Sequence, residues 1–321
     1  MRRFQDLVQD LKAMAANSRA GRPLQPPSSL RFVDHEGRKI YYASMGLDDH
    51  EEGANPPVVL VHGFGGFFMD WPRVMAPISR HTRVYALDLP GWGFSDPNLK
   101  ASRIEDDVRA VEAFLEVLGL KNVILCGLSY GGGVAWAAAA MRARGVREIV
   151  LLNPMPTYPL NFMKSLIYQG IFLMALNERV GKLVHRLMPK SHYKVICKES
   201  LLNFRLLDTF YLDLAFKVIK QPKLSFVLHM QAIGARQVNW ADWEHRLAGI
   251  RMPVTILQGK QDRLFSIASA KHLQSLIPGA KLIEVDKCGH AMVFDQHRKV
   301  SDYLISRLAS STSQGEAQSG S

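Results

Sequence analysis

The chain has 321 residues, of which 47% are hydrophobic and 21% are charged. This composition excludes an intrinsically disordered chain and is sufficient for one large core or two modest ones. The formal net charge of +11 raises the question of an acidic partner, whether nucleic acid, anionic lipid or an acidic substrate, but charge alone does not choose among them.

Cysteine usage and the length of the apolar runs indicate a soluble, unsecreted protein of a reducing compartment, the cytoplasm. Cys126, Cys197 and Cys288 lie far apart and lack the spacing of metal ligands, so we expect free thiols and no metal site. The sequence has no run of the roughly 18 apolar residues that a membrane-spanning helix needs. No apolar block follows the basic Arg2 and Arg3, as it would in a secretion signal.

Residues 1–30 are predicted to form an amphipathic helix followed by a linker. Apolar residues recur at helical spacing between residues 4 and 15, with acids and bases between them. We favour docking of this helix on the protein's own surface or on a second copy over docking on a membrane, because its polar face carries as many acids as bases. The Arg, Pro, Ser and Gly content of residues 16–30 is typical of a linker.

A mostly parallel sheet is predicted from a series of short apolar runs. Alternation in residues 31–34 and 39–42 predicts two antiparallel strands with a turn at Glu36 and Gly37. The later runs are continuous and rich in β-branched residues, which is typical of buried parallel strands covered by helices on both faces. These runs are residues 58–61, 84–87, 123–126, 149–152, 254–257 and 282–285.

Residues 156–236 interrupt this alternation of strands and helices. Their apolar stretches are long and are not bounded by the turn residues that flank strands, which predicts several short helices. The segment has eight lysines and four arginines against four acids, so it carries most of the excess positive charge. A basic stripe with a spacing of four residues is interrupted by Pro189, and we favour a solvated face here over a lipid or nucleic-acid surface. The stripe consists of Lys182, Arg186, Lys190 and Lys194.

A G-x-S-x-G pentapeptide, Gly127-Leu128-Ser129-Tyr130-Gly131, stands between an apolar run and an Ala-rich stretch. A serine on a sharp turn from strand to helix, with glycine on either side, keeps its hydroxyl exposed as a nucleophile. Because a serine hydroxyl is protonated at neutral pH, it needs a base within hydrogen-bond reach and a third group that orients the base. Ser129 is therefore the candidate nucleophile.

Two later residues supply the candidate acid and base. Asp262 and His290 each follow a predicted parallel strand, which places a carboxylate and an imidazole at the carboxyl edge of the sheet. The order Ser129, Asp262, His290 is the one expected after such a serine turn. Asp286 and Asp295 are the alternative carboxylates nearby.

The glycine-rich loop at residues 62–66 follows the first buried parallel strand. Acyl transfer needs two N–H donors aimed at the developing oxyanion, and the backbone amides of Phe64 and Tyr130 are the natural pair. We interpret His62, in the same loop, as a residue that orients the loop by hydrogen bonds rather than as a base.

Together, these motifs resemble the α/β-hydrolase fold superfamily, in its capped esterase, lipase and epoxide-hydrolase-like branch. The resemblance covers about residues 30–309 and includes the turn at 88–95 and the loops that carry the candidate acid and base. It implies an α/β fold: a mostly parallel eight-stranded sheet flanked by helices, with an inserted helical cap. The implied core is residues 31–155 and 237–309, the cap is residues 156–236, and residues 310–321 are expected to be a disordered tail.

The resemblance implies a serine hydrolase that cleaves a small carboxylic ester, such as a lipid or another apolar acyl ester, without metal or cofactor. Relatives that open epoxides or cleave carbon–halogen bonds use an aspartate where this chain has Ser129. Some relatives carry the acid where this chain has Asn153, so Asp262 keeps that role. The expected substrate-binding residues are Gly63, Trp92 and Phe94.

Several alternatives remain open. The same triad could serve carbon–carbon bond or thioester hydrolysis, although relatives that cleave carbon–carbon bonds often have Asn before the serine and Met after it, where this chain has Leu128 and Tyr130. The fold also serves as a non-enzymatic small-molecule receptor in some relatives. We expect no nucleic-acid partner, and peripheral contact with a membrane through the basic segment or the N-terminal helix stays open.

Overall fold

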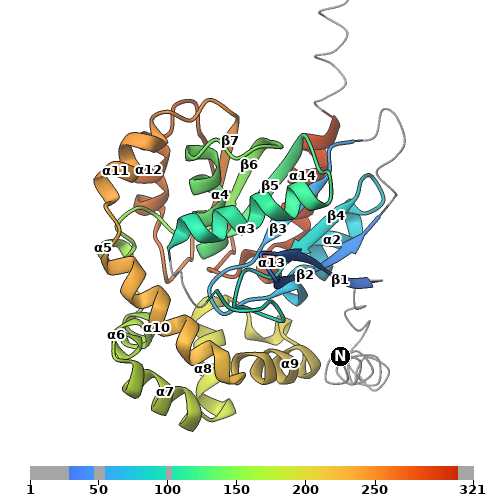
Figure 1. The fold of residues 1–321 in the computed structure, drawn as a ribbon. Helices are drawn as coiled ribbons and strands as arrows, with labels where there is room; N and C mark the ends of the chain where they lie inside the picture. Colours follow the sequence, from blue (N-terminus) through green and yellow to red (C-terminus); the bar gives the residue numbers. More distant parts are fainter. Residues whose placement is uncertain (1–28, 47–54, 99–102, 310–321) are drawn as a thin grey trace, which may run out of the picture.

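The computed structural model describes residues 29–46, 55–98 and 103–309, which form an eight-stranded sheet covered by helices (Figure 1). The strands lie side by side in the order β1-β2-β4-β3-β5-β6-β7-β8. Strand β2 runs antiparallel to both of its neighbours, and the pairs from β4 to β8 are parallel. The strands are β1 (Ser29–His35), β2 (Arg38–Met45), β3 (Val58–Val61), β4 (Val84–Leu87), β5 (Val123–Leu128), β6 (Val146–Leu152), β7 (Val254–Gly259) and β8 (Lys281–Val285). The predicted fold class is therefore confirmed.

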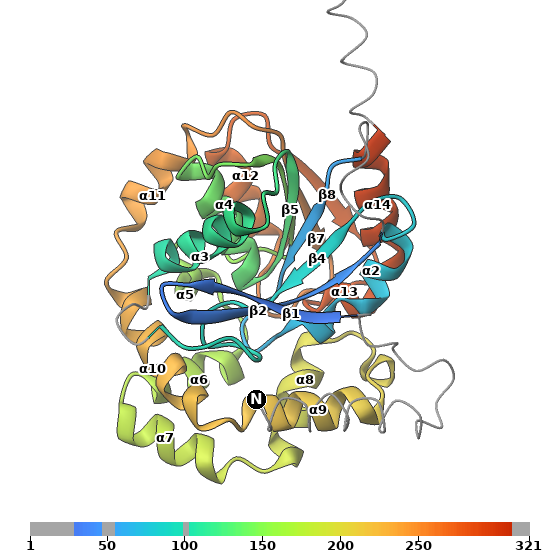
Figure 2. The same cartoon turned by 45° about the vertical axis from the view of Figure 1, so that its right-hand side comes forward.

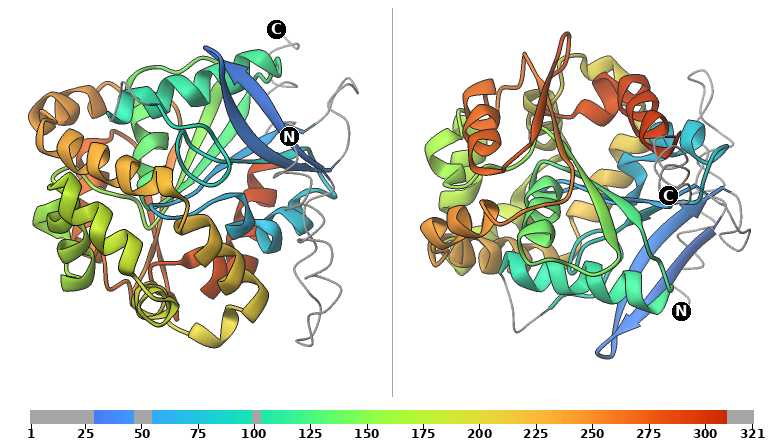
Figure 3. Two further views of the ribbon diagram at one scale, coloured as in Figure 1. Left: turned by 60° about the horizontal axis from the view of Figure 1, so that its bottom comes forward. Right: turned by 90° about the horizontal axis from the view of Figure 1, so that it is seen from above.

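Both faces of the central strands β3, β4, β5 and β7 are buried, which explains why these strands are apolar rather than alternating. In β3, Val58 and Leu60 join the apolar cluster on one face, and Val59 and Val61 join the cluster on the other. The first face packs against α2 and α14, and the second packs against α3, α4, α11 and α12 (Figure 3). These helices are α2 (Pro72–Ile78), α3 (Ile104–Val117), α4 (Tyr130–Ala140), α11 (Trp240–Leu247), α12 (Ile267–Leu276) and α14 (His297–Ala309).

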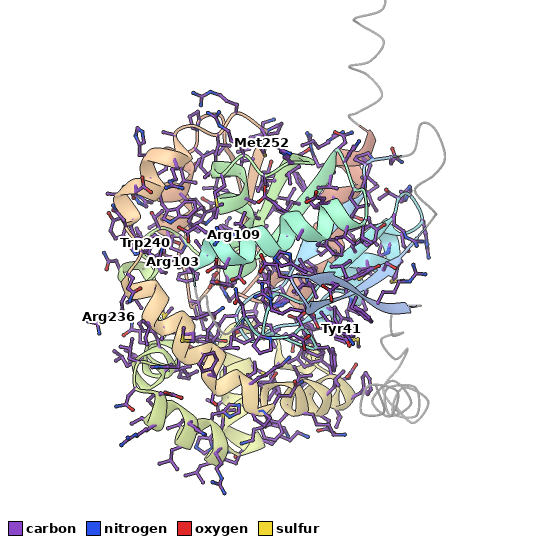
Figure 4. All side chains as sticks on the ribbon, in the orientation of Figure 1. Tyr41, Arg103, Arg109, Arg236, Trp240 and Met252 are labelled. Atoms are coloured by element: carbon purple, nitrogen blue, oxygen red, sulfur yellow. The ribbon has the colours of Figure 1, made fainter. Side chains whose placement is uncertain are left out.

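Between β6 and β7 the chain forms a run of helices, here called the inserted helices, at the carboxyl edge of the parallel strands (Figures 1 and 2). The run leaves the core after β6, and α10 leads back to α11 at the outer edge of the molecule, where Arg236 and Trp240 lie (Figure 4). Pro189 separates α7 from α8, because proline lacks the amide proton that a continuous helix needs. The inserted helices are α5 (Pro159–Phe162), α6 (Leu166–Ala175), α7 (Glu178–Leu187), α8 (Lys190–Ser200), η2 (Phe204–Leu206), α9 (Thr209–Ile219) and α10 (Pro222–Arg236).

The hairpin predicted after the linker is present, and β1 begins at Ser29, two residues before the predicted start. Glu36 and Gly37 form its turn, and both have positive φ angles. The predicted N-terminal helix and the C-terminal tail at 310–321 lie outside the described residues. No helix within residues 29–46, 55–98 and 103–309 has both the length and the apolarity needed to cross a bilayer.

A methyl group at position 131 is expected to disrupt the packing of α4 against the loop after β3. A Cβ atom at Gly131 would overlap the carbonyl oxygens of Val61 and His62, and backbone atoms cannot yield as a flexible side chain would. We expect Gly131→Ala to lower the free energy of unfolding by about 3 kcal/mol, measured by chemical denaturation.

Gly170→Ala is the matched control, because Gly170 lies in helix α6 and a Cβ atom there meets nothing within 4 Å. Alanine is the better helix former, so this variant should gain about 0.5 to 1 kcal/mol. Equal effects of the two substitutions would contradict the packing argument.

Candidate active site

Ser129 lies on a strained turn between β5 and α4. Its backbone has φ 52° and ψ −114°, a conformation that a side-chain-bearing residue rarely adopts and that usually marks a functional position. A Cβ atom at Gly127 would overlap the Gly131 carbonyl, so the turn can be this tight only with glycine at both positions. Ser129 is 8% exposed.

His290 connects Ser129 to Asp262 by two hydrogen bonds. Its Nε2 lies 2.8 Å from Ser129 Oγ, and its Nδ1 lies 2.9 Å from Asp262 Oδ2. A carboxylate only accepts hydrogen bonds, so Nδ1 carries the proton and Nε2 is left with a lone pair for the serine hydroxyl. The structure thus brings together three predicted residues that are separated by up to 161 positions in the sequence.

The Asp262 carboxylate is held by donors from its own loop. Its Oδ1 accepts from the backbone amides of Leu264 at 2.8 Å and Phe265 at 3.1 Å. Its Oδ2 accepts from Gln258 Nε2 at 3.1 Å in addition to His290. These donors fix the orientation of the carboxylate.

Asn153 connects the loops that carry Asp262 and His290. Its side chain is fully buried at the end of β6, where Oδ1 accepts from the Gly259 amide at 2.6 Å. Its Nδ2 donates to the carbonyls of Gly289 at 2.8 Å and His290 at 2.7 Å. An amide side chain supplies both an acceptor and donors, which a carboxylate here would not.

Asp295 takes no part in the triad but anchors the His290 loop to the inserted helices. Its carboxylate accepts from the Gly289 amide at 2.9 Å, and from Leu202 at 3.0 Å and Asn203 at 3.3 Å, which follow α8. The neighbouring backbone bond from Ala291 N to Ser200 O, 2.7 Å long, holds the same two segments together.

The glycine-rich loop is held by His62, as predicted. The ring is fully buried, Nδ1 donates to the Gly63 carbonyl at 2.7 Å, and Nε2 accepts from the Leu89 amide at 3.0 Å. Burial lowers the pKa of His62 to about 4, so the ring is neutral near pH 7.

The predicted oxyanion donors belong to the two segments that flank Ser129. Tyr130 is the first residue of α4, and the first amides of a helix have no partner within the helix. The Tyr130 hydroxyl donates to Asp107 Oδ2 at 2.5 Å, which directs the side chain away from the triad toward α3. Phe64 follows Gly63 and is 36% exposed.

The three predicted substrate-binding residues lie in different surroundings. A Cβ atom at Gly63 would lie 3.2 Å from Ser129 Cβ, so this glycine is next to the nucleophile. Phe94 is half-buried, with its ring 5.7 Å from that of Phe68. Trp92 is 1% exposed, and its ring packs 5.1 Å from the Phe64 ring.

Buried carboxylates brace the loops around the site. Asp88 accepts from the amides of Phe68 at 2.6 Å and Phe94 at 2.9 Å, and Asp70 accepts from the hydroxyl of Tyr211 on α9 at 2.6 Å. Burial raises the pKa of Asp70 and that of Asp88 to about 7. Within the described part of the chain, no three His, Cys, Asp or Glu side chains are grouped to hold a metal ion.

Sequence reasoning missed the positioning roles of Asn153, Gln258 and Asp295. A signal was present for the first two, because each is a polar residue in or directly after an apolar strand, where an unpaired polar group would be costly. Asp295 was only an alternative acid, and its contacts with residues 202 and 203 cross more than 90 positions of sequence.

The stability of the His62 loop should depend on pH. The folded-state pKa of His62, about 4, lies below its ordinary value of 6.5. The contribution of the neutral ring to the free energy of unfolding is therefore fully present above pH 6.5 and is lost as the pH falls toward 4. At pH 5 the loss is about 2 kcal/mol. We expect the stability advantage of wild type over His62→Gln to shrink by this amount between pH 7 and pH 5, measured by urea unfolding.

The comparison between the two proteins at each pH cancels the opposite contributions of the buried aspartates, whose raised pKa values favour the folded state as the pH falls. A wild-type advantage that stays constant with pH would show that His62 is not held neutral.

The chain was compared with known proteins. The model of the alpha/beta hydrolase family matches residues 58–303. A 2-hydroxy-6-oxo-2,4-heptadienoate hydrolase of Pseudomonas putida is 28% identical, over 84% of this chain and 96% of its own. The monoacylglycerol lipase ABHD6 of Homo sapiens is 24% identical, over 88% of this chain and 82% of its own. The fold resembles that of a candidate lipase of Acinetobacter baumannii, with 18% identity, a TM-score of 0.75 and 97% of both chains covered.

The fold and the match over residues 58–303 agree, although the relatives that the chain resembles act on different bonds. The protein therefore belongs to the alpha/beta hydrolase family and is a hydrolase.

Proposed function

We propose that the protein is a serine hydrolase that cleaves a carboxylic ester with an apolar acyl group through an acyl-enzyme intermediate. The observation that carries this proposal is the continuous hydrogen-bonded chain from Ser129 through His290 to Asp262. A serine, a neutral imidazole and a buried carboxylate in this order form the arrangement that turns a hydroxyl into a nucleophile.

In the first half of the reaction, Ser129 Oγ attacks the ester carbonyl carbon while His290 Nε2 accepts the hydroxyl proton. Asp262 stabilises the imidazolium that forms and keeps its Nδ1–H directed away from the serine. The tetrahedral intermediate then expels the alcohol, which takes the proton from Nε2. Water attacks the acyl-enzyme in the second half, with His290 again accepting and returning the proton.

The oxyanion is assigned to the backbone amides of Phe64 and Tyr130. The Tyr130 amide lies at the positive end of the α4 dipole, where negative charge is favoured. The closeness of Gly63 to Ser129 supports the assignment of the Phe64 amide, which follows Gly63 in the chain. Loss of one such donor typically costs about 3 kcal/mol of transition-state stabilisation.

The inserted helices are assigned the role of a cap over residues 31–155 and 237–309. They are bonded to the acid loop from Lys164 N to Leu264 O at 3.0 Å, and to the base loop from Ala291 N to Ser200 O at 2.7 Å. Ser129 and His290 are at most 8% exposed, so an ester reaches the serine only when part of this cover moves.

An apolar acyl group is inferred from the side chains that meet where the cap joins the core. Aromatic rings from both parts pack together there, since the Phe67 ring lies 6.1 Å from Tyr211 of α9 and 6.3 Å from Phe94. Such surroundings favour a hydrocarbon chain over a charged or strongly hydrated group.

A hydrolase that cleaves a carbon–carbon bond is the second candidate. The relative from Pseudomonas putida, which is 28% identical, is named as a hydrolase of 2-hydroxy-6-oxo-2,4-heptadienoate, a compound without an ester bond. The residues on either side of Ser129 favour the ester. They are Leu128 and Tyr130, and the Tyr130 side chain is committed to Asp107.

The first experiment tests the nucleophile. We expect Ser129→Ala to reduce ester hydrolysis by about 10³-fold or more and to abolish labelling by a fluorophosphonate probe, because the hydroxyl forms the covalent intermediate. Ser306→Ala, an exposed serine on α14, should behave as wild type. A wild-type protein that takes no label would indicate a receptor instead of an enzyme.

The second experiment tests the acyl group with p-nitrophenyl esters of increasing chain length and a 2-hydroxy-6-oxo-dienoate. We expect kcat/KM to rise from acetyl to medium or long chains, because each added buried methylene contributes up to about 0.8 kcal/mol. A sharp preference for acetyl would contradict the apolar pocket. Faster turnover of the dienoate than of every ester would favour the second candidate.

A further inference from the structure

Exposed apolar side chains are concentrated on the inserted helices. Among the described residues, 13 large hydrophobic side chains are at least 36% exposed, and nine of them lie between residues 160 and 202. The remaining four are scattered over the core as Phe32, Phe64, Val117 and Ile283. A contiguous apolar surface on an otherwise well-packed protein usually marks an interaction site.

Helix α7 presents a full apolar stripe to solvent. Val180, Leu183, Val184 and Leu187 have the spacing of one helix face and are 43%, 57%, 36% and 68% exposed. The adjacent face of α7 is already in contact with the protein, because His185 Nε2 bonds to the Ile219 carbonyl at 2.6 Å. The core therefore covers only part of the apolar surface of this helix.

The neighbouring helix α6 also carries exposed apolar side chains. Leu166 and Leu173, two turns apart on one face, are 79% and 64% exposed, and a Cβ atom at Gly170 between them would meet nothing within 4 Å. We name the exposed residues of the two helices the α6–α7 face. It consists of Leu166, Gly170, Leu173, Val180, Leu183, Val184 and Leu187.

Basic residues outnumber acids in the segment that contains α6 and α7. Residues 164–200 contain seven lysines and arginines and only two glutamates. Lys182 and Arg186 on α7 are exposed beside the apolar stripe. Long basic side chains at the border of an apolar helix face are typical of helices that lie in the surface of an anionic membrane.

We propose that the α6–α7 face docks on an anionic lipid surface. The positive charge of these helices favours an anionic lipid surface over a second copy of the chain, because two such faces would bring like charges together. The apolar stripe selects it over nucleic acid, which is bound through phosphate contacts and needs no exposed leucines. This proposal rests on the surface of the helices and is independent of ester hydrolysis.

The position of the face adds a consequence for orientation. Helix α7 lies at the end of the molecule that the carboxyl edge of the sheet faces (Figures 1 and 2). Side chains stand out from its outer side (Figure 4). Docking through this face turns the edge that carries the triad toward the lipid.

The experiment is co-flotation of the full chain with vesicles of phosphatidylcholine, with and without phosphatidylserine. We expect wild type to bind the vesicles that contain phosphatidylserine and to lose binding as salt is raised, since exposed charges are screened. The triple variant Leu173→Ser, Leu183→Ser, Leu187→Ser should bind at least about tenfold more weakly. Lys182→Glu with Arg186→Glu should weaken binding to a similar extent.

Matched controls change exposed residues at the opposite edge of the sheet. Val117→Ser, and Lys121→Glu with Arg144→Glu, should bind vesicles as wild type does. Thermal unfolding of every variant shows whether it is folded, without reference to ester hydrolysis.

Three outcomes would overturn the proposal. Wild type that floats with neither vesicle has no lipid-binding face. Variants of the α6–α7 face that float as well as wild type would move the contact to another part of the chain, such as residues 1–28. A dimer seen by light scattering that the triple leucine variant dissociates would make a second copy the occupant.

Discussion

The close approach of two backbone segments at Gly131 is the constraint on which the site depends. Helix α4 begins against the carbonyls of Val61 and His62, with no room for a side chain between them. This contact fixes the start of the helix, and thereby holds Ser129 at φ 52° on a turn that would otherwise relax. It also fixes the distance between the nucleophile and the glycine-rich loop, so both amides proposed for the oxyanion depend on it.

The parallel sheet supplies the second constraint, because the carboxyl ends of its strands meet at one edge. The loops after β5, β7 and β8 carry Ser129, Asp262 and His290, and the loop after β6 carries Asn153, which bonds to the other two. The acid and the base therefore do not hold their positions separately. The buried amide of Asn153 links them from one side, and direct bonds between the two loops, such as that from Gln261 N to Cys288 O, link them from the other.

The inserted helices are bonded to the acid loop, to the base loop and to Asp70. Tyr211 reaches Asp70 beside the glycine-rich loop, the Lys164 amide reaches the Leu264 carbonyl, and the Asp295 carboxylate holds residues 202 and 203. A displacement of these helices would therefore move the acid loop and the base loop together. If these helices act as the proposed cap, a movement that admits substrate to Ser129 also reaches the loops that carry Asp262 and His290.

The sequence by itself was sufficient to predict the fold class and the three residues that the structure brings together, because both predictions depend only on local patterns. Apolar strand runs, the two glycines around Ser129 and the positions of Asp262 and His290 after their strands are readable without long-range contacts. Tertiary structure decided what depends on partners far along the chain. Asn153 and Asp295 became positioning residues through bonds across 92 to 137 positions, and Trp92 is buried against the Phe64 ring. The sequence pattern identified the basic stripe that includes Lys182 and Arg186 but not the exposed apolar stripe beside it, since only packing decides whether protein or solvent covers an apolar helix face.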